Sequence, residues 1–136
     1  AIDDNNIIYA GNGSKIKKFD FDGNFLGQMN LPFTIPNHHS FNNINYSDNK
    51  LLITSTSSIR VLDMQTNQFL ELPFVGSLSR PPGVTISGNE IWLLNQAESS
   101  STINEYLTQY SFDLSSQSYS VNFREMKDWA SPGSSG

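Results

Sequence analysis

Apolar and polar residues alternate in short runs along the chain, and the runs recur in the same order. The stretch KIKKFDFDGNFLGQM (15–29) aligns with SIRVLDMQTNQFLEL (58–72), and LTQYSFDLSSQSYSVNF (107–123) gives a third copy. In each copy one run closes with an apolar–Asp–apolar triplet, a short polar turn follows, and an aromatic residue opens the next run. Short alternating runs bounded by polar turns predict β-strands joined as hairpins.

Matching runs lie upstream of each copy. They read NNIIYAG (5–11), NKLLITS (49–55) and NEIWLLN (89–95), and the second and third copies carry one further run, at 41–47 and 82–88. The unit is therefore a small antiparallel sheet of up to four strands that repeats every 40–50 residues. Prolines mark the links between units, at Pro32, Pro36, Pro73, Pro81 and Pro82.

Both faces of these predicted sheets are apolar. In the second copy Ile59 and Val61 fall on one face, whereas Leu62 and Met64 fall on the other. A sheet in a sandwich alternates more cleanly, while a propeller blade is covered on both sides by its neighbours. We therefore predict an all-β fold of β-propeller blades, each of four antiparallel strands.

The repeat predicts about three blades over residues 1–124, at 1–35, 36–77 and 78–124, and leaves 125–136 as a flexible tail or the start of a further blade. Three blades do not close a ring, so both terminal blades leave an apolar face open. At roughly 25 cal/mol per Å2, several hundred Å2 of such surface corresponds to on the order of 10 kcal/mol. We expect the remaining blades of a larger ring to cover these faces, supplied by the same chain or by another copy.

The stretch DFDGN has two interpretations, a hairpin turn or a metal or acid/base site. Asp-Gly between apolar runs is a strong hairpin signal, and an Asp carboxylate can accept hydrogen bonds from the amides of the turn. The repeat favours the turn, because Asp20 recurs as Asp63 and Asp113 whereas Asp22 becomes Gln65 and Ser115. No bidentate Glu follows to complete a calcium loop.

One segment also fits a helix. In STINEYLTQY (101–110) Ile103, Tyr106, Leu107 and Tyr110 have helical spacing, although alignment with the other copies favours a strand from residue 106 on. The preceding insertion, QAESSSTINE (96–105), leaves room for a helical turn, and a short helix is also possible at the start of the tail from residue 125.

Two segments resemble the NHL repeat. PPGVTISGNEIWLLN (81–95) is similar to its opening, in which Pro-x-Gly-Val leads into a strand, a Gly turn and an aromatic strand. The segment 5–29 is similar to the remainder, an apolar strand followed by Ile-x-x-Phe-Asp-x-x-Gly-x-Phe-Leu. The resemblance implies a six-bladed propeller of the kind found on bacterial surfaces, including lipoproteins, and an extracytoplasmic setting, periplasmic or at the cell surface.

Composition narrows the classes of function. The net charge of −5, without a basic run, argues against a nucleic-acid partner. The absence of cysteine excludes disulfides, thiolate catalysis and Cys-bound zinc. No apolar run reaches the length of a membrane span.

The resemblance also implies that the links between blades and the loops between second and third strands emerge on one face. That face gathers our candidate ligand residues, Asn12, His38, His39, Arg80 and Glu98. Irregular polar loops on a rigid scaffold are where binding usually resides. We predict a non-catalytic binding or scaffold module without a cofactor, whose ligand is a protein, peptide or glycan.

The alternative is an enzyme. Some related propellers are lyases or lactone hydrolases that hold a divalent metal on the central axis, and this resemblance requires acids, Asn or His on the inner strands. Here the inner strands offer only Asn43 and Asn45. We therefore assign no catalytic or metal-binding residue.

Overall fold

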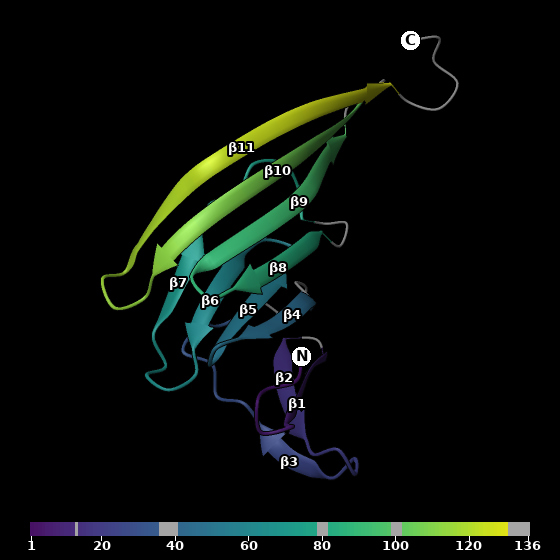
Figure 1. Ribbon diagram of the computed structural model, residues 1–136. Helices are drawn as coiled ribbons and strands as arrows, with labels where there is room; N and C mark the ends of the chain where they lie inside the picture. The colour runs from purple at the N-terminus through teal and green to yellow at the C-terminus, as the bar shows by residue number, and fades with distance from the viewer. Residues whose placement is uncertain (13, 36–40, 79–81, 99–101, 131–136) are drawn as a thin grey trace.

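Figure 1 shows a computed structural model of the chain, which describes residues 1–12, 14–35, 41–78, 82–98 and 102–130. This part of the chain contains strands, turns and bends and no helix, so the predicted all-β class is confirmed. The strands form three separate antiparallel sheets.

Each sheet comes from one copy of the repeat. The first contains β1 (Ile8–Asn12), β2 (Lys15–Phe19) and β3 (Phe25–Gln28). The second, or middle, sheet contains β4 (Phe41–Ser47), β5 (Lys50–Ser55), β6 (Ile59–Asp63) and β7 (Phe69–Leu72). The third contains β8 (Gly83–Ser87), β9 (Glu90–Glu98), β10 (Thr102–Asp113) and β11 (Ser118–Ala130).

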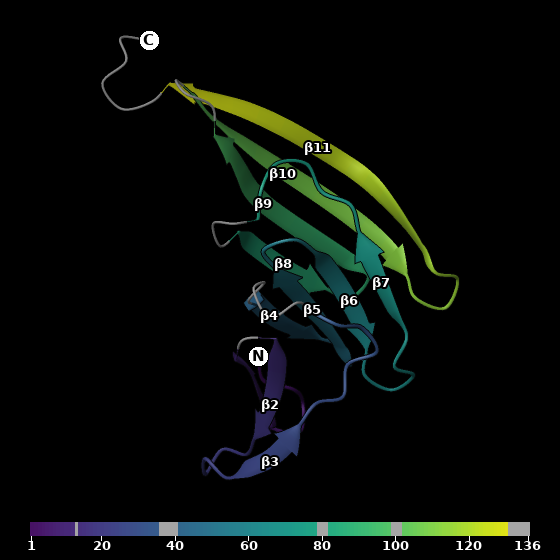
Figure 2. The ribbon, with the colours of Figure 1, turned by 180° about the vertical axis from the view of Figure 1, so that it is seen from behind.

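The strands of every sheet follow chain order, so each sheet is a simple meander. The three sheets succeed one another along the molecule, from the first at the bottom of Figure 1 to the third at the top. The same succession is visible from behind in Figure 2. We call the first strand of each sheet its leading strand. The leading strands lie closest to one another, since β1 contacts β4 and β4 contacts β8.

The middle sheet is buried on both faces. Leu52, Ile59 and Val61 belong to the apolar cluster shared with the third sheet. Leu51, Ile53 and Leu62 belong to a second cluster, together with Tyr9 and Ile16 of the first sheet. The two-faced pattern read from the sequence is therefore confirmed, and each side of the middle sheet carries a core of its own.

The repeated aspartates hold the turns between the last two strands of each sheet. Asp20 accepts hydrogen bonds on Oδ1 from the amides of Asp22 and Asn24, at 3.0 and 2.9 Å. Asp63 accepts from Gln65 and Thr66, and Asp113 from Ser115 and Ser116, in the same way. DFDGN is thus a hairpin turn, and Gly23 provides its positive φ of 84°.

These turns make part of the stability depend on pH. The hydrogen bond from the Asn24 side chain holds the pKa of Asp20 below its usual value, and the Ser115 hydroxyl does the same for Asp113. A lowered folded-state pKa stabilises the fold above the unfolded-state pKa of about 3.9, and this contribution disappears as the pH falls through the folded-state pKa. We expect the urea midpoint to fall as the solution is acidified below about pH 4.

The double variant Asp20→Asn, Asp113→Asn provides the control. Its amide oxygens can still accept the turn hydrogen bonds but do not titrate in this range. We expect a shallower acid dependence than in the wild type, measured by urea denaturation at a series of pH values. Parallel pH curves for the two proteins would contradict the assignment.

Strand pairing corrects the alignment of the first copy by one residue. The sequence places Ile7 at the position of Leu51, but Ile8 pairs with Phe19 as Leu51 pairs with Leu62. The cause is the turn before β1, where Asp3 accepts hydrogen bonds from the amides of Asn5 and Ile7 and Asn6 adopts a φ of 62°. Tyr9 is therefore the counterpart of Leu52, and both face the following sheet.

The third sheet differs most from the sequence expectations. Residues 106–113 are strand, and 96–98 and 102–105 of the insertion extend β9 and β10, with Glu98 paired to Ile103, where a helical turn was considered; residues 99–101 lie outside the described part of the chain. Residues 125–130 continue β11, so the short helix expected at the start of the tail is wrong. The cause is tertiary: each of these residues pairs with a neighbouring strand, which a helix could not do.

Candidate ligand-binding face

One end of the three sheets collects the loops that the sequence singled out. Phe41, which begins β4, pairs with Ser55, which ends β5, and Gly83 lies opposite Leu94 in the same way. The hairpins after β1, β5 and β9 and the links into β4 and β8 therefore lie at the same end of their sheets. We call this the loop-rich end.

The predicted ligand residues belong to the loops and strand ends of the loop-rich end. Their side chains are outside the described part of the chain. The backbone of Asn12 closes β1 opposite Lys15, and that of Glu98 closes β9. His38, His39 and Arg80 lie in segments outside the described part of the chain. Their role as ligand contacts stays a prediction.

The β5–β6 hairpin forms the rigid part of the loop-rich end. The amide of Ser55 donates to the carbonyl of Ser58 at 2.9 Å, and the two hydroxyls, both buried, lie 2.8 Å apart. The amide of Ser57 donates to the Ser55 hydroxyl at 3.3 Å. Ser55, Ser57 and Ser58 are therefore held in one arrangement before any ligand binds.

A depression of about 370 Å3 opens beside this hairpin. It is lined by Ser57, Ser58, Glu71, Leu72, Pro73, Phe74 and Tyr119. Tyr119 comes from the third sheet and every other lining residue from the middle sheet or the segment that follows it. We call this the seam depression.

One of these lining residues, Glu71, has its carboxylate held by an ion pair. Arg60 donates from Nη2 to Oε1 of Glu71 at 3.0 Å, and its guanidinium carbon lies 4.7 Å from the centre of the Phe33 ring. The Arg60 side chain is largely buried, whereas that of Glu71 is more than half exposed. Leu70 and Leu72 pack toward the third sheet, so alternation along β7 places the Glu71 carboxylate, with Arg60, on the first-sheet side of the middle sheet.

Nothing in the sequence singled out the end of β7 or Tyr119. They belong to different copies of the repeat, and they border one depression only because the middle and third sheets pack together. A pattern within one copy cannot show which side chains of two copies meet.

Asn43, one of the two inner asparagines considered for a metal site, ties two sheets together. Its amide nitrogen donates to the carbonyl of Pro82 at 3.0 Å, and that of the neighbouring Asn42 donates to the carbonyl of Leu78 at 2.7 Å. These bonds fix β4 to the link between β7 and β8. Within the described residues, no three His, Cys, Asp or Glu side chains gather closely enough to hold a metal ion.

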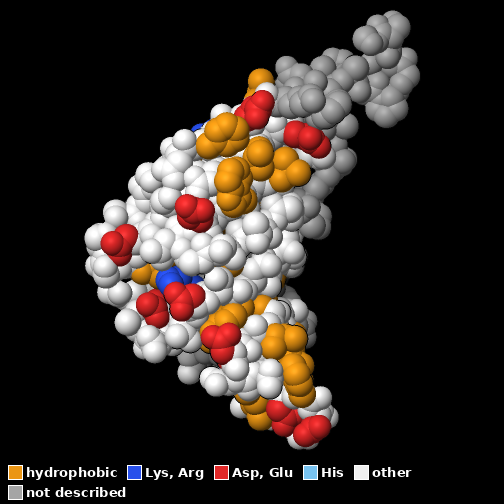
Figure 3. Space-filling view, in the orientation of Figure 1, with side chains coloured by type: hydrophobic (Ala, Val, Ile, Leu, Met, Phe, Trp, Pro, Cys, Tyr) orange, Lys and Arg blue, Asp and Glu red, His pale blue; other side chains and the backbone are white. Residues whose placement is uncertain are grey.

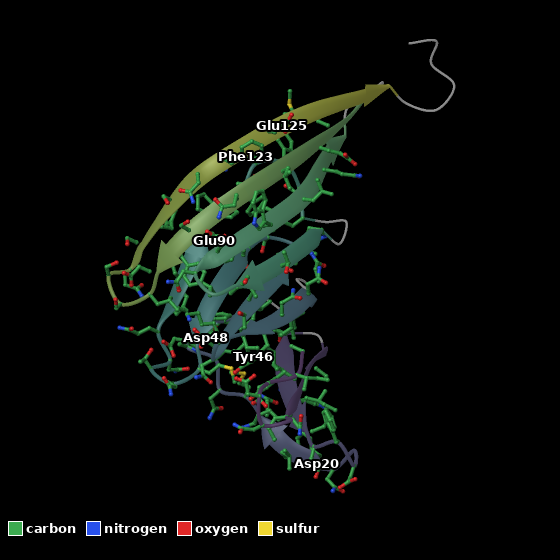
Figure 4. The ribbon with its side chains drawn as sticks, in the orientation of Figure 1. Asp20, Tyr46, Asp48, Glu90, Phe123 and Glu125 are labelled. Carbon is green, nitrogen blue, oxygen red and sulfur yellow. The ribbon has the colours of Figure 1, made fainter. Side chains whose placement is uncertain are left out.

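The opposite end of the sheets is built differently. Figure 4 labels Asp20 at the tip of the first sheet and Asp48 in the turn between β4 and β5. The carboxylate of Asp20 is engaged by its own turn, and Asp48 pairs with Lys50 at 3.5 Å. These acids serve local turns, so the loop-rich end remains the candidate for ligand binding.

Comparison with other proteins does not narrow the choice of ligand-binding site further. Among the described residues there is no helix with the length and hydropathy to cross a membrane. No protein-family model, curated protein or solved structure matches this chain.

Proposed function

We propose that this chain is a non-catalytic binding or scaffold module, made of three consecutive blade-like sheets of a β-propeller arrangement, which binds its ligand at the loop-rich end of the middle sheet. Support for the arrangement comes from the meander in each sheet, the side-by-side leading strands and the apolar residues on both faces. The resemblance of the sequence to NHL repeats and its acidic, cysteine-free composition favour an extracytoplasmic setting.

The observation that carries the binding role is the seam depression. It offers two serine residues and a half-exposed tyrosine on a rigid base. Hydroxyl groups that hydrogen-bond to ligand hydroxyls, beside an aromatic ring that packs against a sugar, suit a neutral, hydroxyl-rich ligand. Among the three ligand classes we therefore favour a glycan.

An array of neutral soluble oligosaccharides tests this assignment. We expect the wild-type protein to bind a subset of the array, and Tyr119→Ala to weaken that binding by about tenfold or more, the loss of a stacking contact. Asp48→Asn, at the opposite end, is the matched control and should bind as the wild type does. Absence of any bound oligosaccharide, or binding that Tyr119→Ala retains, would overturn the glycan assignment.

A further inference from the structure

The outer face of the first sheet carries the residues that the middle sheet uses to pack on its predecessor. Phe19 pairs with Phe25 as Leu62 pairs with Phe69. Leu62 and Phe69 belong to the cluster between the middle and first sheets. In the first sheet Phe25 is instead 59% exposed. We define this first-sheet outer face by Ile8, Phe19, Phe21 and Phe25.

The outer face of the third sheet carries the complementary half of the same interface. Trp92 is the third residue of β9, and Leu52 holds the equivalent position as the third residue of β5. Leu52 is buried against the sheet that follows its own. Within the described residues no sheet packs on Trp92 from this side, and it is 40% exposed, with its ring centre 6.3 Å from that of Phe123. Leu94, Leu107 and Phe123 share this face by strand alternation and pairing, and they complete the third-sheet outer face.

The space-filling view shows the exposed character of this surface. Apolar side chains gather over β9, β10 and β11 in the upper half of Figure 3, with acidic side chains at their margins. Figure 4 places Phe123 and Glu125 on this side of β11. Contiguous exposed apolar patches of this kind mark surfaces that contact another protein.

The charges on the two faces are opposite. Lys15 and Lys17 alternate with the buried Ile16, so they lie on the same face as Phe19. Glu90 and Glu125 flank Trp92 and Phe123 on the third-sheet outer face. Opposite charges steer two faces together and disfavour the pairing of either face with itself.

We propose that two copies of this chain associate head to tail, with the first-sheet outer face of each copy packed on the third-sheet outer face of the other. Within one chain the first sheet packs on the middle sheet, and the middle sheet packs on the third in the same way. The two outer faces are the two halves of one more such contact, so a second copy is the partner that fits both faces. Two such contacts close a dimer in which each copy contributes three sheets. The inference rests on the blade-like arrangement of the proposed function but not on its ligand.

Sedimentation velocity over a range of protein concentrations tests the association. We expect a dimer for the wild type, and weakening by roughly thirtyfold or more in both Phe25→Arg and Trp92→Arg, since each removes an aromatic anchor from both contacts. Met126→Arg is the matched control, because Met126 is an equally exposed apolar residue on β11 whose pairing with Tyr106 places it on the other face. It should dimerise as the wild type does.

A mixture of the two variants separates head-to-tail pairing from other modes. Phe25→Arg retains an intact third-sheet outer face and Trp92→Arg an intact first-sheet outer face, so an equimolar mixture regains one of the two contacts. We expect heterodimers in the mixture at concentrations where each variant alone is monomeric. Far-UV circular dichroism checks that each variant is folded, and Phe25→Ser with Trp92→Ser replaces any that is not.

Three results would overturn the proposal. They are a wild type that stays monomeric at every concentration, a dimer that one of the two arginine variants leaves intact, and open chains that lengthen with concentration. The oligosaccharide array is independent of all three. A monomer that binds sugar would reject the dimer alone, and a dimer that binds none would reject the glycan alone.

Discussion

Replacing Leu52 by alanine is expected to lower the free energy of unfolding by about 2–5 kcal/mol. Leu52 is completely buried in the middle sheet and lies in the cluster that joins this sheet to the third. The other face of the middle sheet is equally covered by the first sheet, so the backbone cannot move toward the lost side chain without disturbing a second core. A cavity that does not collapse gives the upper part of the range.

Urea denaturation monitored by circular dichroism measures this effect, and Leu26→Ala is the matched control. Leu26 is the same residue type in a strand of the first sheet but is about half exposed, so its truncation should change stability by no more than about 0.5 kcal/mol. Similar losses in the two variants would contradict the two-sided burial of the middle sheet. A loss confined to Leu52→Ala supports it.

Alternation within each run was sufficient to predict the two faces of the middle sheet. Ile59 and Val61 were assigned to one face and Leu62 to the other, and the structure places them in different clusters. The aspartate turns were equally predictable, because their hydrogen bonds join residues two to four positions apart. Both features depend on neighbours in the sequence, which a repeat displays directly.

Features that depend on distant residues were not predictable in the same way. The helical spacing of Tyr106, Leu107 and Tyr110 also fits a strand, and only pairing with β9 and β11 decides between them. The one-residue shift of β1 depends on the Asp3 turn, which the other two copies lack. The depression between the end of β7 and Tyr119 depends on how two sheets pack, and no single copy contains that information.

The link between the middle and third sheets contains a position that we expect to accept only glycine. Gly76 has a φ of 88°, and a Cβ built on it would lie 2.9 Å from Nδ2 of Asn95 and 3.2 Å from the carbonyl oxygen of Gln96. Nδ2 of Asn95 also donates to the carbonyl of Val75 at 2.6 Å, so this side chain cannot withdraw without losing a hydrogen bond. Gly76→Ala therefore combines backbone strain with a contact that has no easy relief.

We expect Gly76→Ala to lower the free energy of unfolding by about 2–4 kcal/mol, of which about 1–2 is the left-handed backbone and the remainder the crowded contact. Gly23→Ala separates the two contributions. Its φ of 84° is nearly the same, but nothing lies within 4 Å of the added Cβ, so it should show the backbone cost alone. Equal losses in urea denaturation of the two variants would mean that the link moves aside easily, and the seam between the middle and third sheets would then be less rigid than its hydrogen bonds indicate.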